Sequence, residues 1–240
     1  MKKKKKHFLV TGGMGFIGSA ICGLLINQGH KITIFDDGSR GNTNKNKDIK
    51  KKLKIINGDV RNFNKLNKSL KGVDSVIHLA YVNGTKYFYS KPVLVLDIAV
   101  KGILHIIEAC RKNKVKELFL ASSSEVYQTP NKIPTDEHEP LRIPNIFNPR
   151  YSYGGGKILT ELMGIHYGKK YFKKLIIFRP HNVYGPNMGY DHVIPEFINR
   201  FKKMKKKDNK FEIKGSGNET RSFIFIDDFV SAFDLILKKG

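Results

Sequence analysis

The sequence predicts a protein of the α/β class, with a doubly wound parallel sheet and a small, incomplete C-terminal lobe. Short runs rich in β-branched and aromatic residues alternate with longer amphipathic stretches, which is the pattern of β-α-β units. The length of 240 residues suits one such domain with a minor lobe attached. The apolar runs are no longer than a strand, so no membrane-spanning helix is expected.

The expected elements follow this alternation along the chain. Runs of mainly Val, Ile, Leu, Phe and Thr predict strands at His7–Thr11, Lys31–Phe35, Leu53–Ile56, Ser75–Leu79, Glu117–Ala121 and Leu175–Phe178. Apolar residues at intervals of three and four predict helices at Phe16–Gln28, Phe63–Leu70, Val93–Lys112, Ser152–Tyr171 and His192–Lys205. A polar surface loop is predicted over Gly38–Lys52, and a strand followed by a helix over Phe223–Leu237.

The formal net charge of +23 raises the question of a nucleic-acid partner. The lysines are spread through predicted loops and helix ends, and asparagine is abundant as well, so a compositional drift explains the charge equally well. We therefore expect no specific nucleic-acid function and keep a basic nucleic-acid binder only as a minor alternative.

The two cysteines, Cys22 and Cys110, lie far apart in apolar helical stretches, without Cys or His at ligand spacing. We expect two buried structural thiols, with neither a disulfide nor a metal site. The basic run Lys2–Lys6 precedes only a short apolar run, which does not resemble a secretory signal. A cytoplasmic protein without a membrane partner is expected.

A glycine-rich turn, Thr11–Gly18, follows the first predicted strand and opens the first predicted helix. Glycines there allow a tight turn and let backbone amides approach a pyrophosphate at a helix N-terminus. The second predicted strand is followed by Asp36 and Asp37, where a ribose-binding acid belongs in a Rossmann fold. The combination predicts a dinucleotide site. Its expected contacts in the turn are Gly12, Gly15, Phe16, Ile17 and Gly18.

The carboxylate of Asp36 favours NAD over NADP, because it accepts hydrogen bonds from a ribose diol and repels a 2′-phosphate. Arg40 leaves NADP as a minor alternative. After the third strand, Asp59 and Val60 are candidates to lie beside the adenine. The alternative, that Asp59 is an ordinary turn aspartate, stays open.

Tyr153 and Lys157 are four residues apart on a predicted helix and so share one face. An ammonium at about 4 Å contributes roughly 4 kcal/mol at an effective dielectric near 20, or about three pKa units, enough to bring a phenol pKa near neutrality. The consecutive glycines Gly154–Gly156 are unfavourable in a helix and suggest close approach of a ligand or backbone. The alternative is that they form a loop and Tyr153 is a surface residue.

Together these motifs resemble the extended short-chain dehydrogenase/reductase family, specifically its nucleotide-sugar epimerases and dehydratases. The match runs from about His7 to Leu237. It includes Thr11–Gly18, Asp36, His78–Ala80, the serines that end the fifth strand, Tyr153 with Lys157, and Arg179–Pro186.

The resemblance implies that NAD stays bound through turnover and that a sugar hydroxyl is transiently oxidised to a ketone. Tyr153 would deprotonate the sugar hydroxyl, and Ser123 would share the hydrogen bond of the transferred proton. Lys157 would lower the pKa of Tyr153 and bind the nicotinamide ribose. The family pattern also places Leu79 and Ala80 at the cofactor and Asn182 and Arg221 at the substrate diphosphate.

Glu125 bears on the type of reaction. It resembles the extra acid that dehydratases and decarboxylases of the family carry, but it is equally well a polar residue at a strand end. The leading interpretation is an epimerase or dehydratase. A decarboxylase or reductase of the same family is an alternative, and a catalytically silent NAD-binding protein is a further one.

The resemblance also indicates domains and assembly. Residues 1–179 are expected to form the NAD-binding Rossmann domain and residues 180–240 part of a substrate-binding region, with 222–238 packing back on the first domain. Relatives usually continue beyond this point. Helices Val93–Lys112 and Ser152–Tyr171 are expected to pair in a homodimer. Two departures, Ala99 in place of Asn and Tyr81 in place of a small residue, leave the substrate open.

Overall fold

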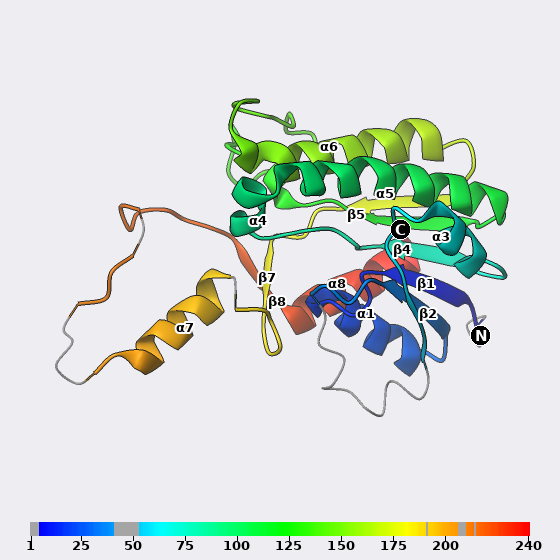
Figure 1. Ribbon diagram of the computed structural model, residues 1–240, viewed down its shortest axis with the longest axis horizontal. Coiled ribbons are helices and arrows are strands. Elements are labelled where there is room, and N and C mark those ends of the chain that lie inside the picture. The colour runs from blue at the N-terminus through cyan, green and yellow to red at the C-terminus, as the bar shows by residue number, and fades with distance from the viewer. Residues whose placement is uncertain (1–4, 41–52, 191, 206–209, 214) are drawn as a thin grey trace.

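The computed structural model describes residues 5–40, 53–190, 192–205, 210–213 and 215–240, so most of the predicted Gly38–Lys52 loop lies outside the described residues. A parallel sheet has the strand order β3-β2-β1-β4-β5-β6 (Figure 1). Its strands are β1 (His7–Thr11), β2 (Lys31–Asp36), β3 (Leu53–Asn57), β4 (Ser75–His78), β5 (Glu117–Ala121) and β6 (Lys174–Phe178). This is the Rossmann order, and the predicted fold class is confirmed.

Helices cover both faces of this sheet (Figure 1). One layer contains α1 (Phe16–Asn27) and α8 (Ile226–Lys239), and the other contains α3 (Phe63–Ser69), α5 (Pro92–Lys112) and α6 (Ser152–Met163). A short helix that the sequence pattern did not predict, α4 (Thr85–Ser90), precedes α5. Its six residues are too few to show helical periodicity.

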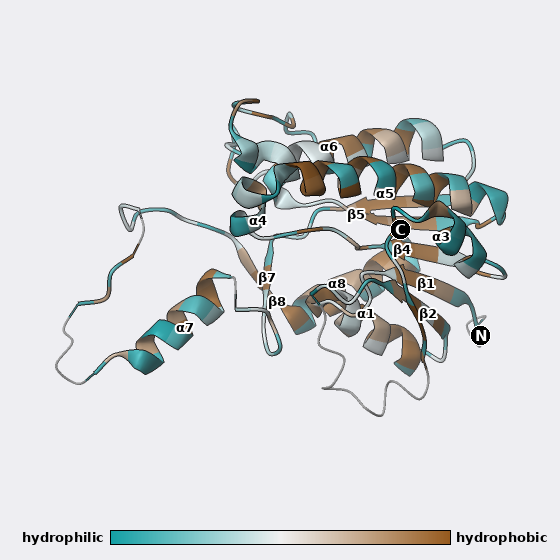
Figure 2. Ribbon diagram, viewed as in Figure 1, coloured by the Kyte–Doolittle hydropathy of each residue, from teal (hydrophilic) through white to brown (hydrophobic). Residues whose placement is uncertain are grey.

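Two apolar clusters lie on opposite faces of the sheet. On β1, Leu9 belongs to the cluster under α3 and α5, whereas Phe8 and Val10 belong to the cluster under α1 and α8. The central strands are consequently apolar over most of their length, as Figure 2 shows for the large sheet. A parallel sheet that is covered on both faces requires this continuous apolar pattern.

The predicted helix Ser152–Tyr171 differs from the structure in its second half. Regular α-helix ends at Met163 and is followed by a π-helical turn over Gly164–Gly168. A Cβ at Gly164 would lie only 2.5 Å from Leu120 Cδ1, so the glycine permits close packing on β5 there. The other predicted elements agree with the structure to within one or two residues at each end.

The C-terminal part contains a second, smaller sheet. Strand β7 (Asn182–Tyr184) pairs in parallel with β8 (Phe223–Phe225), and helix α7 (Val193–Lys203) lies between them in the sequence. Figure 1 shows α7 standing away from the large sheet, whereas α8 packs beside α1. Gln28 Nε2 donates a hydrogen bond of 2.7 Å to Asp234 Oδ1 between these two helices.

Candidate active site

The turn between β1 and α1 is shaped for close approach. Gly12 has a φ of +67°, and a Cβ there would lie 2.8 Å from the backbone nitrogen of Ala80. A Cβ at Gly18 would overlap the carbonyl oxygen of Gly12. Helix α1 begins at Phe16 without a side-chain cap, so its first amides are open to an anion.

The loop after β4 is hydrogen-bonded to this turn. Thr11 Oγ1 accepts hydrogen bonds of 3.2 Å from the backbone nitrogens of both Leu79 and Ala80. Thr11 Oγ1 also lies 2.8 Å from Nδ1 of the buried His78, and burial lowers the pKa of that imidazole to about 3. The structure therefore places the predicted cofactor contacts Leu79 and Ala80 directly against Gly12.

Asp36 lies at the carboxyl end of β2, beside the glycine turn. Its carboxylate accepts hydrogen bonds of 2.9 Å from the backbone nitrogens of Met14 and Gly38. Each carboxylate oxygen has a further lone pair, so the group can still accept from a ribose diol. Asp37 is exposed and bonds to Ser39 instead. The Arg40 guanidinium lies over the ring of Tyr87, 5.4 Å from its centroid.

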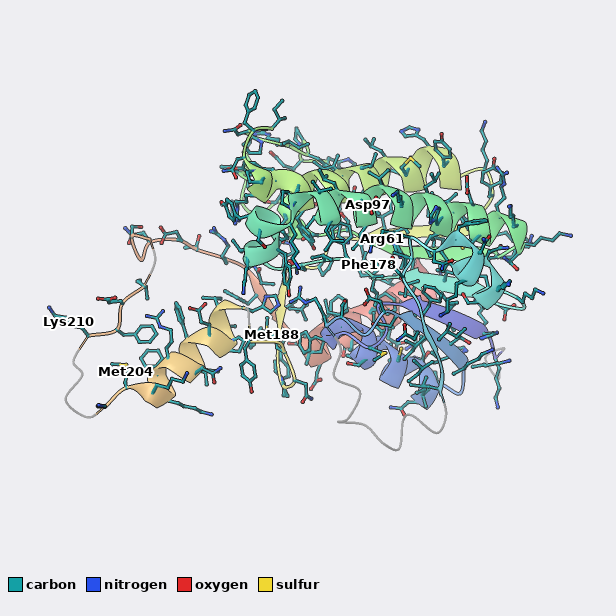
Figure 3. All side chains as sticks on the ribbon, in the orientation of Figure 1. Arg61, Asp97, Phe178, Met188, Met204 and Lys210 are labelled. Atoms are coloured by element: carbon teal, nitrogen blue, oxygen red, sulfur yellow. The ribbon has the colours of Figure 1, made fainter. Side chains whose placement is uncertain are left out.

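Asp59 belongs to an ion-pair network after β3. Arg61 contacts Asp59 at 2.6 Å and Asp97 of α5 at 2.9 Å, and Arg61 and Asp97 are labelled in Figure 3. Hydrogen bonds from Arg61 hold the pKa of the Asp59 carboxyl below its usual range. Val60 is buried in the core. Asp59 thus has the contacts of a structural turn aspartate, and its role beside an adenine stays a prediction.

Ser123, Tyr153 and Lys157 meet where β5 ends. They are 8%, 7% and 4% exposed. Ser123 has extended backbone before a short helical turn, Ser124–Val126, and its Oγ accepts a hydrogen bond of 3.2 Å from the Glu125 nitrogen. Because α6 begins at Ser152, Gly154–Gly156 are helical, and the alternative of a loop with a surface tyrosine is wrong.

The expected effect of Lys157 on Tyr153 is not observed. Burial raises the pKa of Tyr153 to about 12, outweighing the lowering effect of the Ser123 hydroxyl. Lys157 Nζ donates a hydrogen bond of 2.7 Å to the carbonyl oxygen of Ala121 and lies 5.8 Å from the Tyr153 ring centroid. The prediction of a phenol near neutrality is therefore wrong for this arrangement, because desolvation dominates.

Burial acts on Lys157 in the opposite direction. It lowers the pKa of the ammonium to about 7, and the partly compensating influence comes from Glu161 on the same helix. Glu161 is itself paired with Arg179 at the end of β6, through hydrogen bonds of 2.8 and 2.6 Å. Near neutral pH the site therefore contains a protonated phenol beside an amine that loses its proton far more readily than an exposed lysine.

The close approach predicted at the glycines of α6 is confirmed. The groups that approach these glycines belong to the protein itself. A Cβ at Gly154 would lie 3.1 Å from the Glu125 carbonyl oxygen. A Cβ at Gly156 would overlap the Tyr81 hydroxyl.

Glu125 lies at the rim of the site. Its Oε2 is 3.7 Å from Arg150 Nη2, and its charge contributes to the raised pKa of Tyr153. The contact with Arg150 and the proximity to Tyr153 fit either interpretation of Glu125, and a chemical role for it stays a prediction.

The small sheet brings the predicted diphosphate contacts together. Asn182 Nδ2 donates a hydrogen bond of 2.9 Å to the Ser222 carbonyl oxygen, one residue from Arg221. Arg221 is exposed, and its Nη1 donates to the Thr220 carbonyl oxygen.

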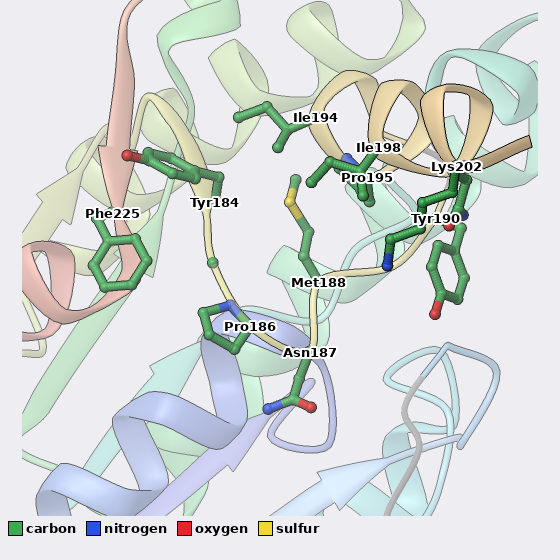
Figure 4. A pocket seen from close by; sticks show the side chains of 12 residues that line it. Tyr184, Pro186, Asn187, Met188, Tyr190, Ile194, Pro195, Ile198, Lys202 and Phe225 are labelled. Atoms are coloured by element: carbon green, nitrogen blue, oxygen red, sulfur yellow. The ribbon is translucent and has the colours of Figure 1, made fainter. Parts of the chain in front are cut away.

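A cavity of about 450 Å³, which the sequence did not reveal, lies between the segment after β7 and α7 (Figure 4). Tyr184, Met188, Ile198 and Phe225 are among its lining residues, and Met188 points toward Ile194 of α7. Its only signal in the sequence is the concentration of Gly, Pro and Asn over residues 185–189.

The described residues include neither a metal-binding cluster nor a membrane-spanning helix. No group of three or more His, Cys, Asp or Glu side chains among them is arranged to hold a metal ion. No helix in this part of the chain is long and apolar enough to cross a membrane. Cys22 and Cys110 are both buried and free, as predicted.

Residues 8–240 match the family model described as the NAD dependent epimerase/dehydratase family. The chain is 36% identical to a Methanocaldococcus jannaschii protein provisionally assigned as UDP-glucose 4-epimerase, with coverage of 93% of this chain and 71% of that protein. It is 31% identical to the UDP-N-acetyl-alpha-D-glucosaminuronate decarboxylase of Bacillus cytotoxicus, over 95% of this chain and 70% of the relative.

Among solved structures, the chain resembles the UDP-glucose 4-epimerase of Thermotoga maritima with UDP-glucose. The TM-score is 0.84 at 26% identity, and the match covers 98% of this chain and 74% of that one.

Proposed function

Because the chain belongs to the NAD dependent epimerase/dehydratase family, we propose that it epimerises or dehydrates a nucleotide-activated sugar. The observation that carries this proposal is the buried meeting of Ser123, Tyr153 and Lys157 at the same edge of the sheet as the glycine turn. The carboxyl ends of parallel strands are where such folds bind ligands.

The residues present fit NAD. The turn at Gly12 and Gly18 leaves no space for side chains, and the uncapped start of α1 offers amides to a pyrophosphate. Asp36, whose carboxylate already accepts from the Met14 and Gly38 amides, would also accept hydrogen bonds from the adenosine ribose. When bound, NAD supplies a reversible two-electron oxidant for a sugar carbinol.

Tyr153 would exchange a proton with the sugar hydroxyl at its Oη. Its pKa of about 12 keeps the phenol protonated at rest, so it is ready to act as an acid. Acting as a base requires stabilisation of the phenolate, for which the Ser123 hydroxyl and the Lys157 ammonium are the nearby donors. Because burial lowers the pKa of Lys157 to about 7, this assistance depends on pH.

The substrate's diphosphate would bind at Asn182 and Arg221, since a guanidinium matches phosphate oxygens in a bidentate way. The neighbouring cavity, with its aromatic and aliphatic lining, is suited to part of the nucleotide. Residues 1–179 would thus hold the cofactor and residues 180–240 would contribute to substrate binding.

A homodimer is also proposed. On α5, Val93, Leu96 and Val100 are exposed and lie at helical spacing on one face, and Leu162 and Ile165 are exposed along the adjacent helix α6 and its π-helical end. A twofold interface would bury this apolar face against its own copy. Light scattering should report a dimer, and a monomer at working concentration would remove this part of the proposal.

The test is incubation of the purified protein with NAD and a panel of UDP-, dTDP-, GDP- and CDP-hexoses. Unchanged mass with a new proton NMR pattern means epimerisation, and loss of water means dehydration. Loss of carbon dioxide from a uronic-acid sugar would instead indicate the decarboxylase alternative and a chemical role for Glu125. A Tyr153→Phe control should form product about 10²–10⁴-fold more slowly. No turnover by a protein that binds NAD would contradict the proposal and favour a silent NAD-binding protein.

A further inference from the structure

Tyr81, in the segment between β4 and α4, is placed against the reactive side chains. Its ring meets Tyr153 edge to face, with 5.1 Å between ring centroids. Lys157 Nζ lies 4.0 Å from the Tyr81 ring centroid. The Tyr81 hydroxyl is buried and has no hydrogen-bond partner among the residues that the structure describes. Neither the glycine turn nor the proposed proton transfer accounts for this residue.

Two small residues make room for the Tyr81 side chain. A Cβ at Gly156 would overlap the Tyr81 hydroxyl and lie 2.7 Å from the Ala99 Cβ. Gly156 is on α6 and Ala99 on α5, so both helices have their smallest side chains where the tyrosine enters. A buried hydroxyl without a partner is unfavourable. The favourable part of this arrangement must therefore come from the ring.

The ring faces a lysine whose ammonium also contacts the backbone. Within the described part of the chain, Lys157 Nζ donates one hydrogen bond, to the Ala121 carbonyl oxygen. Among the ionisable groups around it, Glu161 favours the charged form, whereas His78, with a pKa of about 3, and Tyr153, with a pKa of about 12, are neutral near pH 7. The negative face of an aromatic ring attracts a cation, most strongly where water is excluded.

We propose that Tyr81 is a positioning residue whose ring holds the Lys157 ammonium beside Tyr153 and favours its charged form. The contact with Lys157 stands on geometry alone, and its catalytic consequence rests on the proposed function. A charged Lys157 in this place stabilises the Tyr153 phenolate, so Tyr81 would act on proton transfer through Lys157 without touching the sugar.

The direct test is the titration of Lys157 in NAD-free protein, followed by NMR of lysine labelled with ¹³C at Cε. Exposed lysines titrate near 10.4, so a resonance with a midpoint near 7 is distinct, and Lys157→Met assigns it. Tyr81→Phe keeps the ring and should leave the midpoint unchanged. Tyr81→Leu removes the ring and should lower the midpoint by about one pH unit.

Tyr81→Met is a second variant without a ring, and thermal unfolding identifies the variants that fold. An unchanged or raised midpoint in a folded Leu or Met variant would overturn the proposal. A fall in Tyr81→Phe equal to that in Tyr81→Leu would also overturn it, because the hydroxyl would then be responsible.

Activity gives a second measurement. The pH profile of kcat should contain an apparent pKa that reflects the ionisation of Lys157. This apparent pKa should shift together with the NMR midpoint in Tyr81→Leu and stay unchanged in Tyr81→Phe. Absence of turnover in the wild type would contradict the proposed function, while the titration would still decide the role of Tyr81.

Discussion

The two halves of the candidate site are built in different ways. The glycine turn, Asp36 and Ser123 lie at the carboxyl ends of strands in the large sheet, and Tyr153 and Lys157 lie on α6, which covers one face of that sheet. Asn182 lies on a two-stranded sheet and Arg221 in the segment just before its second strand, and the neighbouring helix α7 contains no buried residue. The main core fixes the geometry of the first half, whereas a few local contacts fix the geometry of the second half.

This difference has a functional meaning. Proton transfer needs positions fixed to a fraction of an ångström, and the buried sheet supplies them. Recognition of the nucleotide tolerates more freedom, and α7 is held largely by its own aromatic contacts, such as the stacking of Phe201 on Phe211 at 3.9 Å. Chemistry and recognition are therefore expected to respond separately to substitution.

The largest expected effect is on chemistry. Tyr153→Phe removes the hydroxyl that we propose exchanges a proton with the sugar, and should lower kcat by about 10²–10⁴-fold. NAD affinity, measured by calorimetry, should change little because the glycine turn and Asp36 are untouched. Wild-type kcat in this variant would show that Tyr153 is not the acid/base.

The next largest effect is expected on the free energy of unfolding, which should differ between substitutions in the two halves. Phe233 is fully buried under the large sheet, so Phe233→Ala should lower the free energy of unfolding by about 3–5 kcal/mol. Phe211→Ala removes only a local contact of the lobe and should lower it by about 1 kcal/mol or less. Chemical denaturation measures both. Equal losses would mean that the lobe is part of the main core.

The pH dependence of stability sharpens the electrostatic side of the comparison. Because the folded pKa of Lys157 is about 7, the unfolded chain binds its proton more tightly, and stability rises with pH from about 7 toward the ordinary lysine pKa near 10.4. Lys157→Met removes this contribution. The stability advantage of Lys157→Met over wild type should shrink by about 2–3 kcal/mol between pH 6 and pH 9. A constant difference would contradict the lowered pKa.

The smallest effect is expected at Arg221, the exposed residue proposed to contact the substrate's diphosphate. Arg221→Ala should raise KM for the nucleotide sugar about tenfold and leave kcat nearly unchanged, since an exposed charged contact contributes modestly. Arg221→Lys should recover part of the affinity. A fall in kcat without a change in KM would place Arg221 in the chemistry instead.

The sequence predicted the parts of the molecule that depend on local pattern. Apolar periodicity located the strands and most helices, and the glycine spacing with Asp36 located the cofactor turn. The orientation of Lys157 was not predictable, because it depends on the Ala121 carbonyl and on the insertion of Tyr81 between helices. The effect of burial on Tyr153 and the cavity beside α7 depend likewise on contacts between distant segments.

The parallel pairing of β7 with β8 has a consequence for how such a protein can diversify. The chain leaves the body at β7, passes through α7 and returns at β8, so the two ends of this excursion are fixed side by side. Its length and composition can then vary without changing the order of the large sheet. The segment between β7 and β8 could therefore be replaced as a unit. Such a replacement would adapt the same nucleotide-binding domain to a new substrate.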